Sequence, residues 1–358
     1  MIGQSDDRPI LITGGAGFIG SNLADRLVRA GHQVIVYDAL SRAGVESNLA
    51  WLKSAHGGRV TSIASDVRDE DELIRAAADV KAVFHMAAQV AVTTSLLDPR
   101  EDFEINVRGT VNLLDAVRVR GEPVPVIFAS TNKVYGDLLD VQLEEHGGRY
   151  EPRALPARRG VDESRALDFH TPYGCSKGAA DQYVLDYARS FGIPTVVFRM
   201  SCIYGERQMG TEDQGWVAHF LIQALQGKPI TIYGDGRQVR DVLDVDDAAD
   251  AYMRALKNID SVAGQAFNLG GGPENAISLL QLVEQISSVT NCDVELNFEE
   301  WRQGDQRWYV SDTHKARAAL GLQRPRGWRD GVAALAQWLA DQRGIELKPQ
   351  RQLASAAQ

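Results

Sequence analysis

Two residues of this chain have types and a spacing that suit proton transfer. Tyr173 and Lys177 stand four positions apart in the segment TPYGCSKGAADQY, which has the pattern of a helix, so both side chains would lie on one helix face. A tyrosine with a pKa near ~10 is a poor base at neutral pH. An ammonium group one turn away, together with an oxidised nicotinamide, would stabilise the phenolate and lower that pKa. Such a pair also arises by chance on helix surfaces, so other residues must support the assignment.

A second polar group follows an apolar run. The run PVIFA (125–129) reads as a strand buried on both faces, and Ser130, Thr131, Asn132 and Lys133 follow at its end. In open α/β sheets, ligands bind at the carboxyl ends of the parallel strands. We therefore expect these polar side chains to face a ligand.

A glycine-rich turn near the N-terminus points to a dinucleotide. In LITGGAGFIG, the residues Gly14, Gly17 and Gly20 lie between an expected strand and an expected helix. Glycines there permit a tight turn, a close approach of the backbone to a pyrophosphate, and close packing of the helix on the strand. The free N–H groups of the helix N-terminus and its dipole favour the phosphates.

The ends of the next two strands refine this hypothesis. Asp38 ends the second strand eighteen residues after Gly20, and a carboxylate there accepts ribose hydroxyls and repels a 2′-phosphate, which favours NAD over NADP. The alternative is that Asp38 is a helix N-cap, and Arg42 nearby could accommodate a 2′-phosphate. Asp66 and Val67, after the third strand, are candidate adenine contacts, although Asp66 could equally cap the following helix.

The elements that must position these residues follow an alternating pattern. Apolar runs predict strands at 9–13, 33–38, 59–65, 82–87, 124–130 and 194–200, and helical periodicity occupies segments between them, such as 18–30 and about 176–191. This alternation predicts an α/β fold with a Rossmann-type, doubly wound parallel sheet. Residues 206–236 and 271–330 mix helical segments with short strands and turns instead of alternating regularly, which indicates a smaller mixed α/β C-terminal lobe. The charged stretch 142–164 is interpreted as an exposed insertion.

The chain resembles the extended short-chain dehydrogenase/reductase family of nucleotide-sugar epimerases and dehydratases. The resemblance runs from about residue 8 to 340 and is carried, in order, by TGGAGFIG, YDAL, SDVRD, FHMAAQV, NVRGTVNLLDA, STNKVYGD, PYGCSKGAADQY, VFRMSCIYGERQ, YGDGRQVRDVLDVDDAADA and DQRWYVSD. It implies that Thr131, Tyr173 and Lys177 are catalytic and that Asn106 is structural or supports the lysine. It also implies NAD contacts at Phe18, Ile19, Ala87 and Ala88, and a homodimer formed through a four-helix bundle.

The substrate side contains several arginines. Guanidinium groups bind phosphate oxygens bidentately, so Arg240 and Arg307 suit the two phosphates of a nucleotide diphosphate sugar, although a salt bridge to Asp241 or Asp305 is the alternative for either one. Tyr233 is expected against the base or ribose. The remaining expected substrate-binding residues are Arg207, Asn132 and Lys133.

Several reactions compete within the family. The resemblance implies that dehydratases of this family carry Thr-Asp-Glu at this strand end, where the carboxyl pair performs the acid–base chemistry of water loss. This chain has Asn132 and Lys133 at the positions of that pair, and these side chains cannot perform the same proton transfers. The closer resemblance is to 2-epimerases of CDP-linked sugars. It implies oxidation at C2, a turn of the ketosugar and reduction of its opposite face, and cell-envelope polysaccharide (O-antigen) assembly. Alternatives are a UDP-hexose or UDP-hexuronate 4-epimerase, a net dehydrogenase, and a non-catalytic NAD-binding protein.

Composition and length set further bounds. We expect residues 1–200 to form the NAD-binding domain, with a segment around 237–270 returning to it, residues 201–345 mainly a nucleotide-sugar-binding lobe, and residues 346–358 a flexible tail. The net charge of −10 argues against a nucleic-acid partner. Neither the three cysteines nor the seven histidines have ligand spacing, so no metal is expected, and His85 is interpreted as a packed residue. No apolar segment is long enough for a membrane, which favours a cytoplasmic protein.

Overall fold

A seven-stranded parallel sheet forms the larger part of the protein. The computed structural model describes residues 6–347. The strand order is β12-β8-β5-β4-β1-β2-β3, and all neighbours are parallel. The strands are β1 (Ile10–Thr13), β2 (Val34–Asp38), β3 (Val60–Ala64), β4 (Ala82–His85), β5 (Val126–Thr131), β8 (Thr195–Met200) and β12 (Gln265–Leu269). The predicted doubly wound α/β fold is confirmed.

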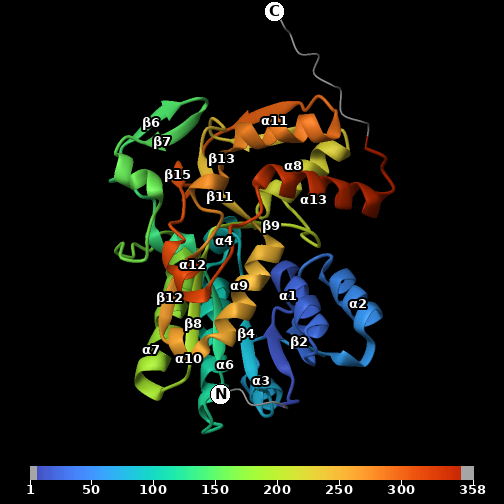
Figure 1. Cartoon of the computed structure of the whole chain (residues 1–358), viewed down its shortest axis with the longest axis vertical. Helices are drawn as coiled ribbons and strands as arrows, with labels where there is room; N and C mark the ends of the chain where they lie inside the picture. Colours follow the sequence, from blue (N-terminus) through green and yellow to red (C-terminus); the bar gives the residue numbers. More distant parts are fainter. Residues whose placement is uncertain (1–5, 348–358) are drawn as a thin grey trace, which may run out of the picture.

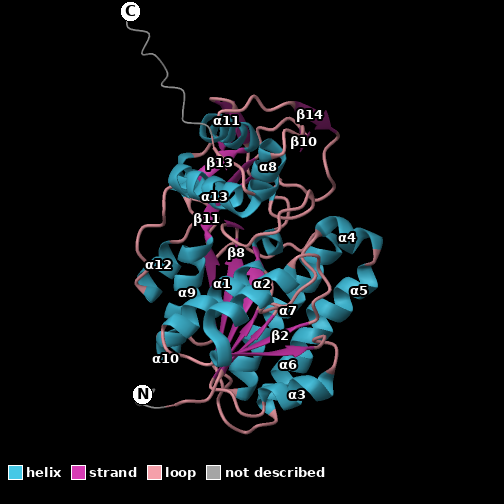
Figure 2. Ribbon diagram, turned by 90° about the vertical axis from the view of Figure 1, so that its right-hand side faces the viewer, coloured by secondary structure: helices cyan, strands magenta, loops and turns pink. Residues whose placement is uncertain are grey.

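Helices cover both faces of this sheet (Figure 2). One face packs against α1 (Phe18–Arg29), α2 (Val45–His56), α9 (Val245–Lys257), α10 (Ile259–Val262) and α12 (His314–Leu320). The other face packs against α3 (Glu70–Ala77), α6 (Gly109–Arg118) and α7 (Thr171–Phe191). Because both faces are buried, the strands consist of nearly continuous apolar residues, as the sequence indicates.

The connection between β4 and α6 contains the short helices α4 (Val92–Leu97) and α5 (Pro99–Phe103) and a π-helical segment, η2 (Glu104–Arg108). These elements contact α7. Helix α7 itself begins at Thr171, five residues before the position near Ser176 that periodicity predicts. Pro172 lies in its first turn, where the missing N–H costs no helical hydrogen bond.

A smaller lobe lies beyond the carboxyl ends of the large sheet (Figure 1). Its strands are β9 (Cys202–Tyr204), β10 (Ile230–Tyr233), β11 (Val239–Asp244), β13 (Ala276–Ser278), β14 (Leu296–Glu299) and β15 (Trp308–Tyr309), in which β11 pairs with β9, β13 and β15, and β10 with β14. The helices α8 (Trp216–Leu225), α11 (Leu279–Thr290) and α13 (Trp328–Arg343) share one apolar core with β9, β10, β11, β13 and β14, whereas β15 belongs to a neighbouring cluster. The stretch 142–164 contains an antiparallel hairpin of β6 (Leu143–His146) and β7 (Arg149–Pro152), followed by the turn η4 (Leu155–Arg159). Single helical turns elsewhere are η1 (Gly57–Arg59), η3 (Asn132–Tyr135) and η5 (Pro273–Asn275).

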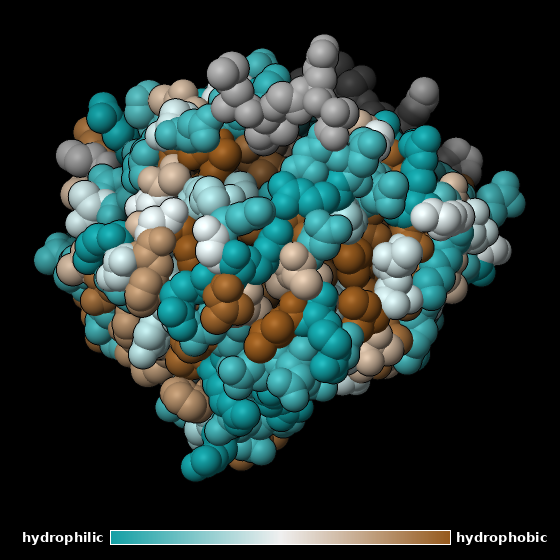
Figure 3. Space-filling model, turned by 90° about the horizontal axis from the view of Figure 1, so that it is seen from below, coloured by the Kyte–Doolittle hydropathy of each residue, from teal (hydrophilic) through white to brown (hydrophobic). Residues whose placement is uncertain are grey.

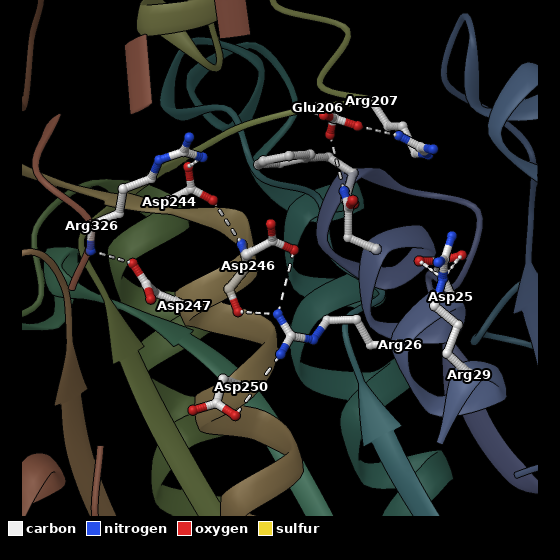
Figure 4. A network of polar contacts seen from close by, with 12 residues as sticks. Asp25, Arg26, Arg29, Glu206, Arg207, Asp244, Asp246, Asp247, Asp250 and Arg326 are labelled. Atoms are coloured by element: carbon white, nitrogen blue, oxygen red, sulfur yellow. Dashed lines mark hydrogen bonds and ion pairs between the residues drawn. The ribbon is translucent and has the colours of Figure 1, made fainter. Parts of the chain in front are cut away.

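Charged side chains join α9 to its neighbours on both sides (Figure 4). Arg26 of α1 lies 3.4 Å from Asp246 and 3.9 Å from Asp250. Arg326, just before α13, lies 3.3 Å from Asp244, the residue that caps α9. The segment that returns to the large sheet is therefore attached both to the first helix of that sheet and to the last helix of the smaller lobe.

Two further observations concern expectations from the sequence. Within residues 6–347, none of the helices combines the length and the apolar character needed to cross a membrane, and no group of three or more His, Cys, Asp or Glu residues is placed to hold a metal ion. The expected tail at 346–358 falls almost wholly outside the described residues.

Candidate active site

A cleft of about 620 Å³ runs along the carboxyl ends of β1, β2, β4 and β5 and is closed on its other side by the smaller lobe. Residues from the glycine-rich turn, from the ends of these strands, from α7 and from the loops before α8 and β15 all line it. It therefore brings together residues that lie up to about 290 positions apart, from Gly14 to Asp305.

The glycine-rich turn is shaped for close approach. Gly14 has a φ of +66°, and a Cβ there would lie 2.6 Å from the backbone N of Ala87. A Cβ at Gly20 would lie 2.2 Å from the carbonyl oxygen of Gly14, so helix α1 can pack on the turn only with glycine at this position. Gly17 is the N-cap of α1, and Phe18, Ile19, Ala87 and Ala88 line the cleft beside it. This geometry fits a dinucleotide pyrophosphate at the helix N-terminus.

Asp38 ends β2 at the rim of the cleft. Its carboxylate accepts hydrogen bonds from the backbone N of Ala16 (3.0 Å) and of Leu40 (2.9 Å), and burial raises its pKa. The alternative that Asp38 caps a helix is wrong, because the N-cap of α2 is Gly44. Arg42 also lines the cleft, and it donates a hydrogen bond to the side chain of Gln214.

Asp66 and Val67 both line the cleft after β3. The alternative role for Asp66 as a helix cap is wrong, because Asp69 caps α3 by accepting a hydrogen bond from the backbone N of Glu72. The Asp66 carboxylate instead pairs with Arg68 at 2.8 Å, and this bonding lowers its pKa. Asp66 and Val67 thus lie where a bound dinucleotide could contact them, and Arg68 already balances the charge of Asp66.

Thr131, Tyr173 and Lys177 lie together at the centre of the cleft. All three are buried, with 6, 9 and 3% of their surface exposed, and all three line the cleft. Thr131 ends β5, whereas Tyr173 and Lys177 lie one turn apart on α7, which packs against β5. The expected catalytic set is therefore assembled from two elements that adjoin in space.

Burial dominates the electrostatics of this set. Burial raises the pKa of Tyr173 to about 12, and a hydrogen bond with Thr131 opposes this rise. Burial also lowers the pKa of Lys177 to about 7, although the carboxylates of Asp102 and Asp181 act to raise it. Because both groups are removed from water, both charged forms are disfavoured, and Lys177 alone does not lower the pKa of Tyr173.

His85 is packed, as predicted. It is 1% exposed, and its ring nitrogens lie 2.6 Å from Thr13 Oγ1 and 3.0 Å from Thr110 Oγ1. Burial lowers its pKa to about 3, and the charge of Lys177 acts in the same direction. A neutral imidazole at this depth serves the packing between β4 and its neighbours.

Arg240 and Tyr233, both expected at the substrate, line the cleft on the side of the smaller lobe, and so does Arg302. The guanidinium of Arg302 lies 3.7 Å from the ring centroid of Tyr233 and pairs with Glu212 at 3.3 Å. Arg240 pairs with Asp305 at 2.6 Å, so the salt bridge considered as its alternative is present.

Two predicted arginines are directed elsewhere. Arg307 is exposed and is not among the residues that line the cleft; its guanidinium lies over Trp301 and Tyr150, at 5.4 and 5.9 Å from their ring centroids. The backbone carbonyl of Arg307 accepts a hydrogen bond from Val239 N (3.0 Å), beside Arg240, but of these two arginines only Arg240 lines the cleft. Arg207 borders the cleft, but its guanidinium stacks 3.4 Å from the Trp51 ring.

Asn132 and Lys133 line the cleft and also hold the segment that covers it. Asn132 Nδ2 donates to Gln306 Oε1 (3.0 Å), and Lys133 Nζ donates to the carbonyl oxygen of Gly304 (2.8 Å). Burial lowers the pKa of Lys133 to about 8, with a further contribution from Arg240. These polar groups, expected at sugar hydroxyls, thus bond to the segment that carries Arg302.

Arg302, Trp216 and His219 are among the cleft residues that sequence reasoning missed. Arg302 stands five positions before Arg307 in an irregular segment, so no periodicity indicated which of the two faces inward. Trp216 and His219 begin α8, where their aromatic type was the one available signal.

A doubly wound sheet with this glycine turn, an acid at the end of β2, and a Thr, Tyr and Lys set at the end of β5 defines a dinucleotide-dependent enzyme that transfers hydride and protons. The comparisons with known proteins agree. The chain belongs to the NAD dependent epimerase/dehydratase family, whose model matches residues 10–270.

Individual relatives lie within the same family. The chain is 46% identical over 336 residues to CDP-paratose 2-epimerase of Salmonella typhi, covering 92% of this chain and 98% of that protein. A structure of UDP-glucose 4-epimerase with UDP-glucose from Thermotoga maritima matches with a TM-score of 0.80 at 30% identity, covering 93% of this chain and 99% of the other. A UDP-glucose 4-epimerase complex with NAD from Thermus thermophilus matches with a TM-score of 0.78 at 29% identity, covering 92 and 98%. The protein is therefore an NAD-dependent enzyme of the nucleotide-sugar epimerase family.

Proposed function

We propose that the protein epimerises a CDP-linked sugar at C2, as in the conversion of CDP-paratose to CDP-tyvelose. The observation that carries this choice is the 46% identity to CDP-paratose 2-epimerase over 92% of the chain. The cleft supports the general chemistry, because it joins the Thr131, Tyr173 and Lys177 set to a wall that contains Arg240 and Arg302. We also propose that the large sheet binds the cofactor and the smaller lobe binds the nucleotide.

The residues of the chain have distinct parts in this proposal. The glycine-rich turn and Asp38 would hold NAD, which would supply the hydride acceptor and donor for the sugar carbon. Tyr173 removes the proton of the reacting hydroxyl, and Thr131, which hydrogen-bonds with Tyr173, also holds that hydroxyl. Because Lys177 alone does not lower the pKa of Tyr173, its charge would favour the phenolate together with the oxidised nicotinamide of NAD. Burial in the cleft excludes water and strengthens each of these interactions.

Dehydration is not part of this proposal. It would require a carboxyl pair at the end of β5, where Asn132 and Lys133 stand instead. Both of these side chains already donate hydrogen bonds to residues 304 and 306. A non-catalytic NAD-binding role is disfavoured as well, because such a protein has no use for a buried Tyr, Thr and Lys set.

The test is incubation with a panel of CDP-, UDP-, GDP- and dTDP-sugars, followed by NMR analysis of the products. Inversion at C2 of a CDP-sugar is expected, with NAD that remains bound and shows no net reduction. Inversion at C4 with C2 untouched would instead establish the 4-epimerase alternative, which the match to UDP-glucose 4-epimerase structures favours. Stoichiometric accumulation of reduced cofactor would indicate a net dehydrogenase.

We further propose a homodimer formed through a four-helix bundle. Exposed apolar side chains occur on the adjoining helices α4, α5 and α7: Leu97 is 87% exposed, Phe103 52%, Tyr183 47% and Phe191 52%. On the face seen in Figure 3, by contrast, the hydrophobic areas are small and separated by hydrophilic ones. Sedimentation equilibrium should give twice the chain mass, and Phe103→Glu should shift it to the monomer.

A further inference from the structure

A buried carboxylate stands behind the catalytic helix. Asp102, in α5, is 0% exposed and accepts hydrogen bonds from Gln89 Nε2 (2.9 Å), Asn106 Nδ2 (3.2 Å) and Ser176 Oγ. Asn106 Nδ2 also lies 3.0 Å from Ser176 Oγ. The cluster thus joins three segments: the one that follows β4, the π-helical turn η2, and α7.

The position of this cluster along the chain connects it to the chemistry. Gln89 lies between Ala88 and Val90, both of which line the cleft, and Ser176 lies between Tyr173 and Lys177 on α7. The backbone N of Tyr173 in turn donates to Ser95 Oγ (3.2 Å) in α4. Asp102 therefore bonds through Gln89 to the segment 88–90, here called the cofactor wall of the cleft, and through Ser176 to the turn of α7 that carries Tyr173 and Lys177.

The charge of Asp102 is not matched by its hydrogen-bonding partners. All three donors are neutral groups; burial raises the pKa of Asp102, and the positive charge that opposes this rise is that of Lys177. Asp102 acts in turn to raise the pKa of Lys177 and that of Tyr173. A buried carboxylate favours an ammonium nearby and disfavours a phenolate.

The other charged and titratable groups near Lys177 are accounted for. Asp181, one turn further along α7, forms a bidentate pair with Arg199 at 3.0 Å, which offsets its charge. His85, on β4, is held neutral by burial. Asp102 is thus the one carboxylate acting on Lys177 whose charge no arginine partner offsets among the residues that the structure describes.

We propose that Asp102 is a positioning residue for the reaction, which holds the Tyr173–Lys177 turn against the cofactor wall and supplies the negative charge that sets the protonation of both groups. This inference rests on the proposed function only in assigning the proton transfer to Tyr173. Asp102 does not line the cleft, so it acts on the reaction through other residues. It positions the helix turn through its hydrogen bond with Ser176, and its charge acts on Lys177.

The test follows the ionisation of Tyr173 directly, so that it needs no substrate. The near-ultraviolet absorbance of phenolate is recorded against pH for NAD-loaded protein, and the Tyr173→Phe curve is subtracted to isolate the one tyrosine. In Asp102→Asn the titration of Tyr173 should move to lower pH by about one unit, since a buried charge that opposes the phenolate has been removed. Where turnover is measured, both limbs of its pH profile should move to lower pH together.

Matched variants separate charge from structure. Glu101→Gln makes the same change at the exposed neighbouring position of α5 and should leave the titration in place. If Asp102→Asn fails to fold, Asp102→Ser replaces it: the charge is removed and a small polar group remains, so the titration should move in the same direction. A lower turnover with an unmoved titration of Tyr173, or an equal movement in Glu101→Gln, would overturn the proposal. A moved titration in a protein that turns over no nucleotide sugar would overturn the proposed function alone.

Discussion

Replacement of Arg302 tests the placement of the nucleotide diphosphate most directly, because sequence and structure disagree there. We expect Arg302→Ala to weaken the binding of CDP or UDP, and Arg307→Ala to have little effect. Arg302 lies in the cleft against Tyr233, whereas Arg307 is exposed outside it.

The size of the effect follows from the interaction that Arg302 would gain with a phosphate and the ion pairs that it would lose. A hydrogen bond between charged groups contributes about 1.5–3 kcal/mol. Binding of a phosphate must replace the partly exposed pairs of Arg302 with Glu212 (3.3 Å) and Asp213 (3.6 Å), and such pairs contribute about 0.2–1 kcal/mol each. The midpoints of these ranges, about 2.3 kcal/mol gained and about 1.2 kcal/mol given up, leave about 1 kcal/mol, or about a 5-fold increase in Kd.

Isothermal titration calorimetry of CDP and UDP with the NAD-loaded protein measures this change without knowledge of the sugar. Arg302→Lys keeps the charge and loses the planar group that stacks on Tyr233 and binds phosphate with two donors, so its Kd should lie between those of the wild type and Arg302→Ala. An Arg307→Ala variant that weakens binding as much as Arg302→Ala would refute the assignment.

Three further predictions concern the cofactor side. Tyr173→Phe should reduce turnover by about 10²- to 10⁴-fold while the bound NAD content is unchanged, as measured by NMR of products and by cofactor absorbance; normal turnover would exclude Tyr173 as the base. Gly20→Ala should abolish copurification of NAD, because its Cβ would meet the Gly14 carbonyl oxygen at 2.2 Å; a full NAD content in the folded variant would contradict the tight turn. The pKa of Lys177 is about 7 in the folded protein against 10.5 for an unperturbed lysine, so between these values the unfolded chain binds more protons and stability rises with pH. Relative to Lys177→Met, NAD-free wild type should gain on the order of 1 kcal/mol per pH unit from pH ~7 to ~10 in urea unfolding, and no such gain would show that the ammonium is not desolvated.

Much of the site could be predicted because its signals are local. Gly14, Gly17 and Gly20 are required by backbone geometry at one turn, and Asp38 follows from the end of the next strand. Tyr173 and Lys177 share a helix face by their spacing alone. Each of these inferences needs only the secondary structure and the rule that parallel strands present their carboxyl ends at one edge.

The parts that failed or were missed depend on the folding of irregular segments. Arg302 and Arg307 have the same chemistry and lie five residues apart, and the turn between them decides which one faces the cleft. Asn132 and Lys133 read as groups for a sugar, yet the segment 304–306 lies within hydrogen-bonding distance of both. No period in the sequence encodes such contacts.

By itself, the amino-acid sequence determined the doubly wound sheet, the glycine-rich turn and the placement of Tyr173 and Lys177 on one helix face, since these depend on periodicity, on glycine geometry and on residue spacing within single elements. Only the tertiary structure decided the protonation environment of those two residues. Tyr173 and Lys177 are removed from water by the packing of α7 against β5, and the carboxylate that acts on both of them comes from α5, about 70 positions away in the chain. Burial and charge are properties of that packing, because desolvation depends on every neighbour in space and not on neighbours in sequence.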